Sequence, residues 1–213
     1  MVMIAIIDYG MGNLHSVSKA LERLEYPYFI SGNREELVKA QGLILPGVGS
    51  FRDGMKELED AGLIDFIRSW TAQNRPLLGI CLGMQLLFEE SEENGITSGL
   101  SLLEGRVEKM TGVSHTGERY KVPHMGWNAL SFEQRNHPIL HKVSKGHVYF
   151  VHSYAVKVTN HEDLVATADY FGVVPAVVAK NNVWGTQFHP EKSSTVGIGM
   201  LQNFADYVEG ARV

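Results

Sequence analysis

The only cysteine of the chain, Cys81, stands between Gly79 and Gly83 in a pattern suited to nucleophilic chemistry. An apolar run over residues 76–80 predicts a buried strand before it, and residues 84–89 have a helical pattern. A strand, a sharp turn between small residues and a helix form a nucleophile elbow, which exposes the reactive side chain at its apex. The start of the helix supplies N–H groups and a positive dipole that favour a thiolate. A buried cysteine that only packs is the alternative.

A thiol nucleophile needs a base, and the base needs a group that orients it. Among nine histidines, His189 stands out because it follows an apolar strand pattern, residues 183–188, as Cys81 follows its own strand. Pro190 favours an extended conformation at His189, so Glu191 projects to the same side and can hold one ring nitrogen. The spacing therefore predicts a triad of Cys81, His189 and Glu191. A loop histidine beside an ordinary surface glutamate is the alternative.

An acyl-transfer site also needs N–H donors for the negative oxygen of the tetrahedral intermediate. The elbow itself places one such donor, the backbone N–H of Leu82. Residues 46–50, here called the oxyanion loop, follow a predicted strand, and their glycines allow the backbone to approach a ligand closely. We expect the second donor from this loop, although a plain strand-to-helix turn explains the same pattern.

Three weaker patterns favour structure over chemistry. Residues 10–12 contain two glycines of a dinucleotide fingerprint but lack the third, so a tight turn is the better interpretation. His137 and His141 have the spacing of a helical metal site, but Pro138 between them disfavours a helix, and we expect no metal. The acidic residues 89–93 are predicted to form a solvated helix end, from which one carboxylate could bind a cationic substrate group.

The elements that must position these residues follow a regular order in the first half of the chain. Strands are predicted at residues 3–8, 28–30 and 42–45, and helices at 15–24, 34–40 and, with a break near Gly62, 53–73. Repeated strand–helix units predict an α/β fold with a parallel sheet and helices on both faces. Ligands of such sheets bind beyond the carboxyl ends of the strands, where Cys81 and the oxyanion loop are expected.

The second half has a different pattern, with short strands separated by turns. Strands are predicted at residues 105–110, 127–132, 147–158, 164–170 and 176–179, and a closing helix at 199–208. We expect these strands to be antiparallel and to lie in or beside the parallel sheet.

Length and composition predict one domain over residues 1–213. The formal net charge of −5 and the lack of a Lys/Arg cluster argue against nucleic-acid binding. A single cysteine excludes an internal disulfide and fits a reducing compartment. The apolar start, residues 1–7, lacks a basic flank and is too short for a signal peptide, and no run has transmembrane length. We therefore expect a cytoplasmic protein without membrane contact.

Several motifs together resemble a known family. The elbow and the His-Pro-Glu sequence are similar to those of the class I, or triad, glutamine amidotransferases. Others are similar in particular to the glutaminase subunits of imidazole glycerol phosphate synthase: Tyr9-Gly10-Met11-Gly12-Asn13, Pro46-Gly47-Val48-Gly49-Ser50-Phe51, Pro123-His124-Met125-Gly126-Trp127-Asn128 and His189-Pro190-Glu191-Lys192-Ser193. The resemblance covers essentially the whole chain.

This resemblance implies a flavodoxin-like, mostly parallel sheet and the hydrolysis of glutamine to glutamate and ammonia, without a cofactor. Cys81 would form a thioester, and His189, oriented by Glu191, would transfer the protons. The oxyanion would be met by the N–H of Leu82 and by the segment of Val48 and Gly49. The amino-acid head of glutamine would be held by four residues: Gln85, Glu93, Ser153 and Tyr154.

The resemblance also implies a partner. A cyclase subunit with a (β/α)₈ barrel would form a heterodimer with this chain, take the ammonia and make imidazole glycerol phosphate in histidine biosynthesis. By motif match, Asn13, Tyr149 and Lys192 would lie on the face that meets this cyclase.

Three alternatives remain open. The glutaminase subunit of another synthase, such as anthranilate or pyridoxal phosphate synthase, would carry a different oxyanion loop. A cysteine peptidase of related fold usually has a histidine directly after the nucleophile, where this chain has Leu82. A non-catalytic subunit that only senses glutamine would not need the intact triad.

Overall fold

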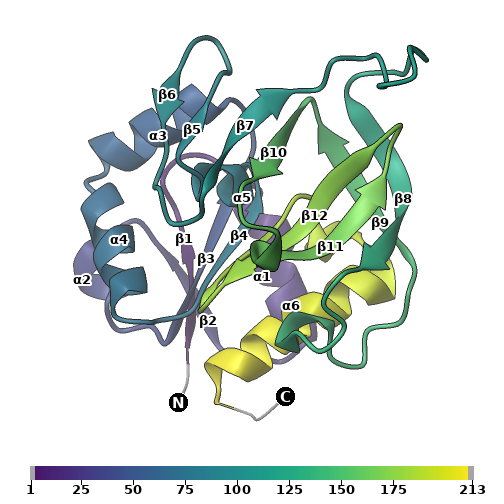
Figure 1. Ribbon diagram of the computed structural model, residues 1–213. Coiled ribbons are helices and arrows are strands. Elements are labelled where there is room, and N and C mark those ends of the chain that lie inside the picture. Colours follow the sequence, from purple (N-terminus) through teal and green to yellow (C-terminus); the bar gives the residue numbers. More distant parts are fainter. Residues whose placement is uncertain (1–2, 211–213) are drawn as a thin grey trace.

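The computed structural model describes residues 3–210, and its centre is a nine-stranded mixed sheet (Figure 1). The strand order is β2-β1-β3-β4-β13-β12-β11-β8-β9. Five neighbouring strands at one side are parallel: β2 (Tyr28–Ser31), β1 (Ile4–Ile7), β3 (Gly42–Gly47), β4 (Leu77–Cys81) and β13 (Val183–Thr186). This confirms the predicted α/β class, and it brings the ends of β3, β4 and β13 to one edge.

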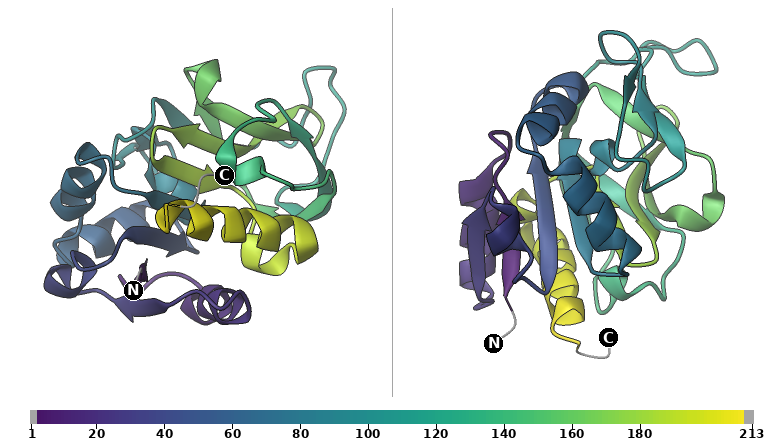
Figure 2. Two further views of the ribbon diagram at one scale, coloured as in Figure 1. Left: turned by 90° about the horizontal axis from the view of Figure 1, so that it is seen from below. Right: turned by 90° about the vertical axis from the view of Figure 1, so that its left-hand side faces the viewer.

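Helices cover both faces of the parallel strands, because side chains alternate along each buried strand (Figure 2). On β1, Ile4 and Ile6 pack on one face with α1 (Leu14–Arg23) and α6 (Ser194–Val208). Ala5 and Ile7 pack on the other face, with the remaining helices. These are α2 (Arg34–Leu37), α3 (Phe51–Asp60), α4 (Ile64–Ala72) and α5 (Leu82–Leu86).

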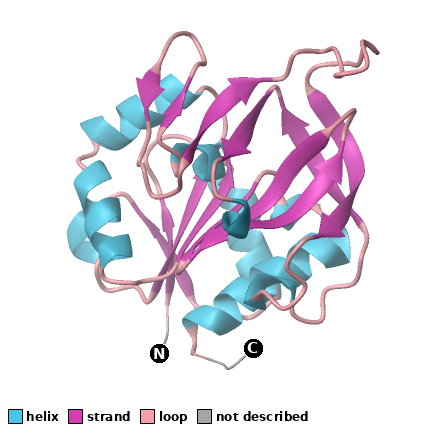
Figure 3. Ribbon diagram, in the orientation of Figure 1, coloured by secondary structure: helices cyan, strands magenta, loops and turns pink. Residues whose placement is uncertain are grey.

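The second half of the chain extends this sheet with antiparallel strands and adds a second sheet (Figure 3). Strands β12, β11, β8 and β9 are antiparallel to their neighbours. Their bounds are Val173–Lys180, Leu164–Asp169, His124–Phe132 and His147–His152. The second sheet has the order β10-β7-β5-β6, with bounds Tyr154–Val158, Gly105–Lys109, Glu90–Ser91 and Thr97–Ser98. The expectation of antiparallel strands both in and beside the main sheet is confirmed.

Several predicted bounds differ in the structure: α2 ends at Leu37, β8 begins at His124 and α6 begins at Ser194.

Two further differences lie where the chain passes from one layer to the other. Residues 147–158, predicted as one strand, form β9 and β10, which belong to different sheets and are separated at Ser153. The helix after Cys81 is only α5, and it ends at Leu86 rather than at residue 89. Both differences arise because the chain leaves one layer for the other, a tertiary event that an apolar pattern does not encode.

Side-chain caps start two helices directly behind strand ends. Asn13 accepts a hydrogen bond from the N–H of Ser16 at the start of α1, and Ser50 accepts one from the N–H of Asp53 at the start of α3. The loops from β1 and β3 therefore have fixed ends. Three short 3₁₀ turns, η1 (Pro138–Leu140), η2 (His161–Asp163) and η3 (Pro190–Lys192), complete the elements.

Within the apolar start of the chain, Ile4–Ile7 form β1, which lies between β2 and β3 in the sheet. Met1 and Val2, which belong to the same apolar run, lie outside the described residues. Over residues 3–210, no helix combines the length and the apolar character needed to cross a bilayer.

Candidate active site

Cys81 lies at the turn between β4 and α5 in a strained backbone conformation. Its φ of 55° and ψ of −110° are unusual for a residue with a side chain. A Cβ atom on Gly79 would lie 2.6 Å from the carbonyl oxygen of Gly83 and 2.8 Å from the Cα of Met84, so only glycine fits there. The turn thus has the geometry predicted for a nucleophile elbow, with small residues required by close packing.

His189 follows β13 at the same edge of the sheet. Its backbone is extended, as the following proline predicts, and its Nδ1 lies 2.9 Å from Oε1 of Glu191. Both side chains are buried. Glu191 itself stands in η3, so the short turn, and not a continued strand, brings the carboxylate back to the ring.

The charges around His189 favour its protonated form. Burial, the largest single effect, lowers its pKa, but the interactions with the Cys81 side chain and with Glu191 together outweigh burial and raise the pKa to about 9. A positive imidazolium beside the sulfur of Cys81 is the arrangement that suits a thiolate nucleophile.

One cavity of about 430 Å³ contains Cys81 and His189. It is also lined by every residue predicted to bind substrate: Val48, Gly49, Leu82, Gln85, Glu93, Ser153 and Tyr154. These residues come from the end of β3, the elbow, the acidic segment and the break between β9 and β10. The structure therefore brings together residues that lie far apart in the sequence.

The buried amides of Gln85 and Gln187 connect Cys81 to the opposite wall of this cavity. The Nε2 of Gln85 donates to the carbonyl of Tyr154 at 2.9 Å and to Oε1 of Gln187 at 3.0 Å. The Nε2 of Gln187 in turn lies 3.9 Å from the sulfur of Cys81. Both hydrogens of the Gln85 amide are thus used within the protein, which leaves its oxygen to accept from a ligand.

The acidic segment 89–93 is not the predicted solvated helix end. Its carboxylates accept hydrogen bonds from backbone N–H groups: Glu89 from Gly105 at 2.8 Å, Glu92 from Lys109 at 2.8 Å and Glu93 from Phe51 at 2.7 Å. The bond of Glu93 ties the cavity wall to the first residue of α3, directly after the oxyanion loop.

Sequence reasoning missed two buried histidines beside the cavity. His152 lines the cavity, and its Nε2 lies 3.0 Å from Nδ1 of His124. Burial lowers the pKa of both rings to about 4, so both are neutral near pH 7. The resemblance had singled out the segment of His124 without giving the ring a role.

The hydrogen bonds fix which nitrogen of each ring carries the proton. His152 Nδ1 faces the carbonyl of Tyr154 at 2.8 Å, so it is a donor and its Nε2 is an acceptor. His124 must therefore donate through Nδ1, and its Nε2 accepts from the amide of Asn128 at 3.3 Å. These hydrogen bonds form a relay from Asn128 through His124 and His152 to the carbonyl of Tyr154, which also accepts from Gln85. The relay therefore stabilises the cavity wall.

The three predicted interface residues lie next to the histidine end of the site. Asn13 caps α1, which packs against η3, the turn that ends at the exposed Lys192. The carbonyl of Tyr149 accepts from the N–H of His189 at 3.2 Å. Met125 and Trp127, which are 60% and 54% exposed, lie two residues apart on the neighbouring strand β8, opposite Val151 and Tyr149 of β9.

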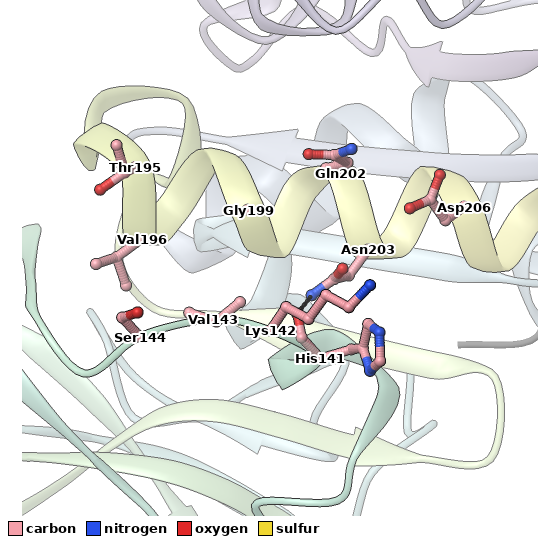
Figure 4. Close-up of a pocket in the computed structure, with 10 residues that line it drawn as sticks. All are labelled: His141, Lys142, Val143, Ser144, Thr195, Val196, Gly199, Gln202, Asn203 and Asp206. Carbon is pink, nitrogen blue, oxygen red and sulfur yellow. Dashed lines mark hydrogen bonds between the residues drawn. The ribbon is translucent and has the colours of Figure 1, made fainter.

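A second hollow, of about 440 Å³, lies between α6 and the segment 141–144 (Figure 4). Asn203 closes one side of it by donating to the carbonyl of His141 at 2.8 Å. His137 and His141 do not gather ligands: over residues 3–210, no group of three His, Cys, Asp or Glu side chains could hold a metal ion. The glycines of residues 10–12 serve a loop in which Gly12 packs against Pro46.

The sequence of this chain matches the family model of the class-I glutamine amidotransferases over residues 5–207. The chain belongs to this family. It is 62% identical over 207 residues to the imidazole glycerol phosphate synthase subunit HisH of Halalkalibacterium halodurans, covering 97% of each chain. The protein of the same name from Bacillus subtilis is 56% identical over 202 residues, covering 95% of each.

Solved structures agree on the fold. A glutamine amidotransferase crystal structure superposes with a TM-score of 0.75 at 20% sequence identity, covering 97% of this chain and 98% of the other. A glutamine amidotransferase from Thermotoga maritima gives a TM-score of 0.70 at 14% identity, with 97% of each chain covered.

Proposed function

We propose that this chain is the glutaminase subunit of imidazole glycerol phosphate synthase, which supplies ammonia for a step of histidine biosynthesis. The observation that carries the proposal is the single cavity that holds the thiol, the histidine paired with a carboxylate, and an acidic wall. The relatives named HisH, about 60% identical over nearly the full chain, select this synthase among those that use glutamine.

In the proposed mechanism, the sulfur of Cys81 attacks the side-chain amide carbon of glutamine. The negative oxygen that forms is stabilised by the N–H of Leu82 and by an N–H of the oxyanion loop at Val48 or Gly49. His189 gives its proton to the amide nitrogen, which leaves as ammonia when the C–N bond breaks, and a thioester remains on Cys81. His189 then takes a proton from water, which attacks the thioester and releases glutamate. Glu191 holds the ring in the orientation that both steps need.

The opposite wall of the cavity suits the head of the amino acid. Glu93 offers a carboxylate, and the amide oxygen of Gln85 is a second acceptor for the ammonium group of glutamine. Ser153 and Tyr154 supply backbone at the break between two strands, where N–H groups are not committed to one continuous ladder. The carboxylate of glutamine would bind there.

The ammonia needs a protected route to its acceptor, because in water it would be protonated and diluted. Met125 and Trp127 are exposed apolar residues, and Trp127 contacts Tyr149, so a cyclase subunit would dock on this part of β8 and β9 with Lys192 nearby on η3. We propose a (β/α)₈-barrel cyclase as this partner, with Asn13 at the rim of the contact.

The substitution Cys81→Ala tests the function. In the complex with the cyclase subunit, the variant should lose glutamine-dependent synthesis by orders of magnitude, yet keep synthesis from added ammonia. Retained glutamine hydrolysis would contradict the assignment of the nucleophile. A subunit that only senses glutamine would bind a glutamine-like electrophile without alkylation of Cys81, which mass spectrometry would reveal.

Deletion of the gene distinguishes this synthase from its relatives. The deletion strain should need histidine for growth, and neither tryptophan nor vitamin B6 should replace it. A need for tryptophan would point to anthranilate synthase, and a need for vitamin B6 to pyridoxal phosphate synthase.

A further inference from the structure

Tyr9 lies at the base of the oxyanion loop, and the mechanism above does not use it. Its side chain is 3% exposed, and its hydroxyl donates a hydrogen bond of 2.8 Å to the carbonyl oxygen of Pro46. Tyr9 follows β1, and Pro46 lies near the end of β3, the neighbouring strand. A buried side chain thus crosses from one strand end to the next.

The strand register explains why this carbonyl takes a side-chain donor. The pairing of β1 with β3 ends at Ile44, whereas the pairing of β3 with β4 continues to Gly47, which lies opposite Cys81. Beyond Ile44, the side of β3 that faces β1 therefore has no paired strand residue to hydrogen-bond with. The Tyr9 hydroxyl supplies a donor there, so the buried carbonyl of Pro46 stays satisfied.

The same hydroxyl lies against Gly47 and the elbow. A Cβ atom on Gly47 would be 2.7 Å from the Tyr9 hydroxyl oxygen, 2.8 Å from the backbone nitrogen of Gly83 and 2.9 Å from Cβ of Leu82. The peptide between Pro46 and Gly47 is therefore packed between the hydroxyl and the residues that follow the nucleophile. Rotation of this peptide would break the hydrogen bond in a space with no room for rearrangement.

The next two residues are placed differently. Val48 and Gly49 are exposed, line the catalytic cavity, and Gly49 has a φ of +101°. Their N–H groups are the candidate donors for the oxyanion. The loop can therefore rotate only from Val48 onward, because the Pro46–Gly47 peptide before it is tightly packed.

We propose that Tyr9 is a positioning residue, whose hydroxyl fixes the Pro46–Gly47 peptide and so confines rotation of the oxyanion loop to the peptides of Val48 and Gly49. The hydroxyl remains a donor over the working pH range, because burial and the nearby Cys81 raise the pKa of Tyr9 above its usual value. The expected effect of Tyr9 on glutamine hydrolysis rests on the proposed glutaminase activity, whereas its effect on the mobility of the oxyanion loop does not.

The substitution Tyr9→Phe keeps the ring and removes the hydrogen bond. In the complex with the cyclase subunit, we expect kcat for glutamine hydrolysis to fall about 3- to 10-fold, with KM for glutamine changed less than about twofold, because the oxyanion exists only in the transition state. Tyr28→Phe is the matched control. Tyr28 lies at the start of β2, at the opposite end of the parallel strands, and its hydroxyl donates a hydrogen bond of 2.7 Å to Glu22 of α1. Removing this hydroxyl should leave both constants unchanged.

Amide hydrogen exchange of the same variants gives a readout that needs no activity. Exchange at Gly47 and Val48 should become faster in Tyr9→Phe and remain as in the wild type in Tyr28→Phe. An unchanged kcat, or a raised KM at constant kcat, in an active complex would overturn the role of Tyr9 in catalysis. If the wild-type complex does not hydrolyse glutamine, the proposed function fails, and the exchange rates still decide whether Tyr9 fixes the loop. Unchanged exchange would overturn the proposal.

Discussion

Gly83 lies so close to Leu45 that a Cβ atom on the glycine would be 1.8 Å from the carbonyl oxygen of Leu45 and 2.9 Å from its carbonyl carbon. This contact allows α5 to begin directly against β3. As a result, the N–H of Leu82 and the oxyanion loop lie on the same side of Cys81. Gly83, two residues after Cys81, is thus required by the close approach of a neighbouring strand.

Gly83→Ala should therefore separate α5 from β3. We expect the variant to lose about 1–3 kcal/mol of unfolding free energy and most of its glutaminase activity, because the backbone oxygen of Leu45 has no flexible end that could move aside. Chemical denaturation and a glutamate-release assay measure the two effects.

Gly199→Ala is the matched control for this change. Gly199 lies within α6, and a Cβ atom there would meet only Cγ2 of Val143, at an ordinary 3.5 Å. It should gain about 0.5–1 kcal/mol of unfolding free energy from helix propensity, with activity unchanged. Similar behaviour of the two variants would contradict the role given to the contact between Gly83 and Leu45.

Glu191→Gln keeps the shape of the triad but removes the charge that stabilises the imidazolium. We expect kcat to fall by about 10⁴-fold, against about 10⁶-fold for Cys81→Ala or His189→Ala, since an orienting group is less essential than a nucleophile or a base. Steady-state assays of the three single variants give the comparison. An equal loss in all three would mean that Glu191 does more than orient the ring, and no loss would remove it from the triad.

The raised pKa of His189 also predicts how stability changes with pH. His189 is protonated more readily in the folded chain, with a pKa of about 9 against 6.5, so its contribution to stability is complete below pH 6.5 and is lost as the pH rises through 9. Urea unfolding of the wild type between pH 6.5 and 9 should show this loss, and Glu191→Gln should show less of it. A wild-type curve that rises over this range would contradict the pairing of His189 with Glu191.

The rings of His124 and His152 should stay neutral, each with its proton on Nδ1, from pH 8 down to about pH 4, where their pKa lies. Nitrogen-15 NMR of the imidazole rings distinguishes the tautomers. Because these pKa values are lowered from 6.5, the two rings contribute stability that is present above pH 6.5 and is lost as the pH falls through 4. A proton on Nε2 of His152 would break the relay to Tyr154.

The chain alone should be a poor glutaminase, and the proposed cyclase partner, with its own ligand bound, should activate it. The exposed residues Val48 and Gly49 can rotate their N–H groups toward or away from the oxyanion, and Lys192 directly follows Glu191, so a contact there reaches the triad. A coupling of about 1–3 kcal/mol on the transition state changes turnover about 5- to 150-fold. Glutamate release is measured for the chain alone, with the partner, and with the partner and its ligand. Equal rates in all three samples would exclude this gating but leave the triad intact.

Local patterns predicted the parts of the site that depend on neighbours in sequence. The turn at Cys81 between glycines, and the contact of His189 with Glu191 two residues on, need only a strand end and a turn, so spacing predicted this local geometry. The relay of His124 and His152 needs two strands brought into register, and no local pattern contains that register. The acidic segment was predicted wrongly for a similar reason, because its carboxylates bind N–H groups of residues such as Phe51 and Gly105, far away in sequence.

The break at Ser153 links the cavity to the assembly of the whole fold. Residues before it belong to the nine-stranded sheet and residues after it to the four-stranded sheet, while Ser153 and its neighbours His152 and Tyr154 line the cavity. A glutamine molecule in the cavity would therefore touch both layers and stabilise their docking. Binding of glutamine and docking of the two sheets would then be linked equilibria, each favouring the other.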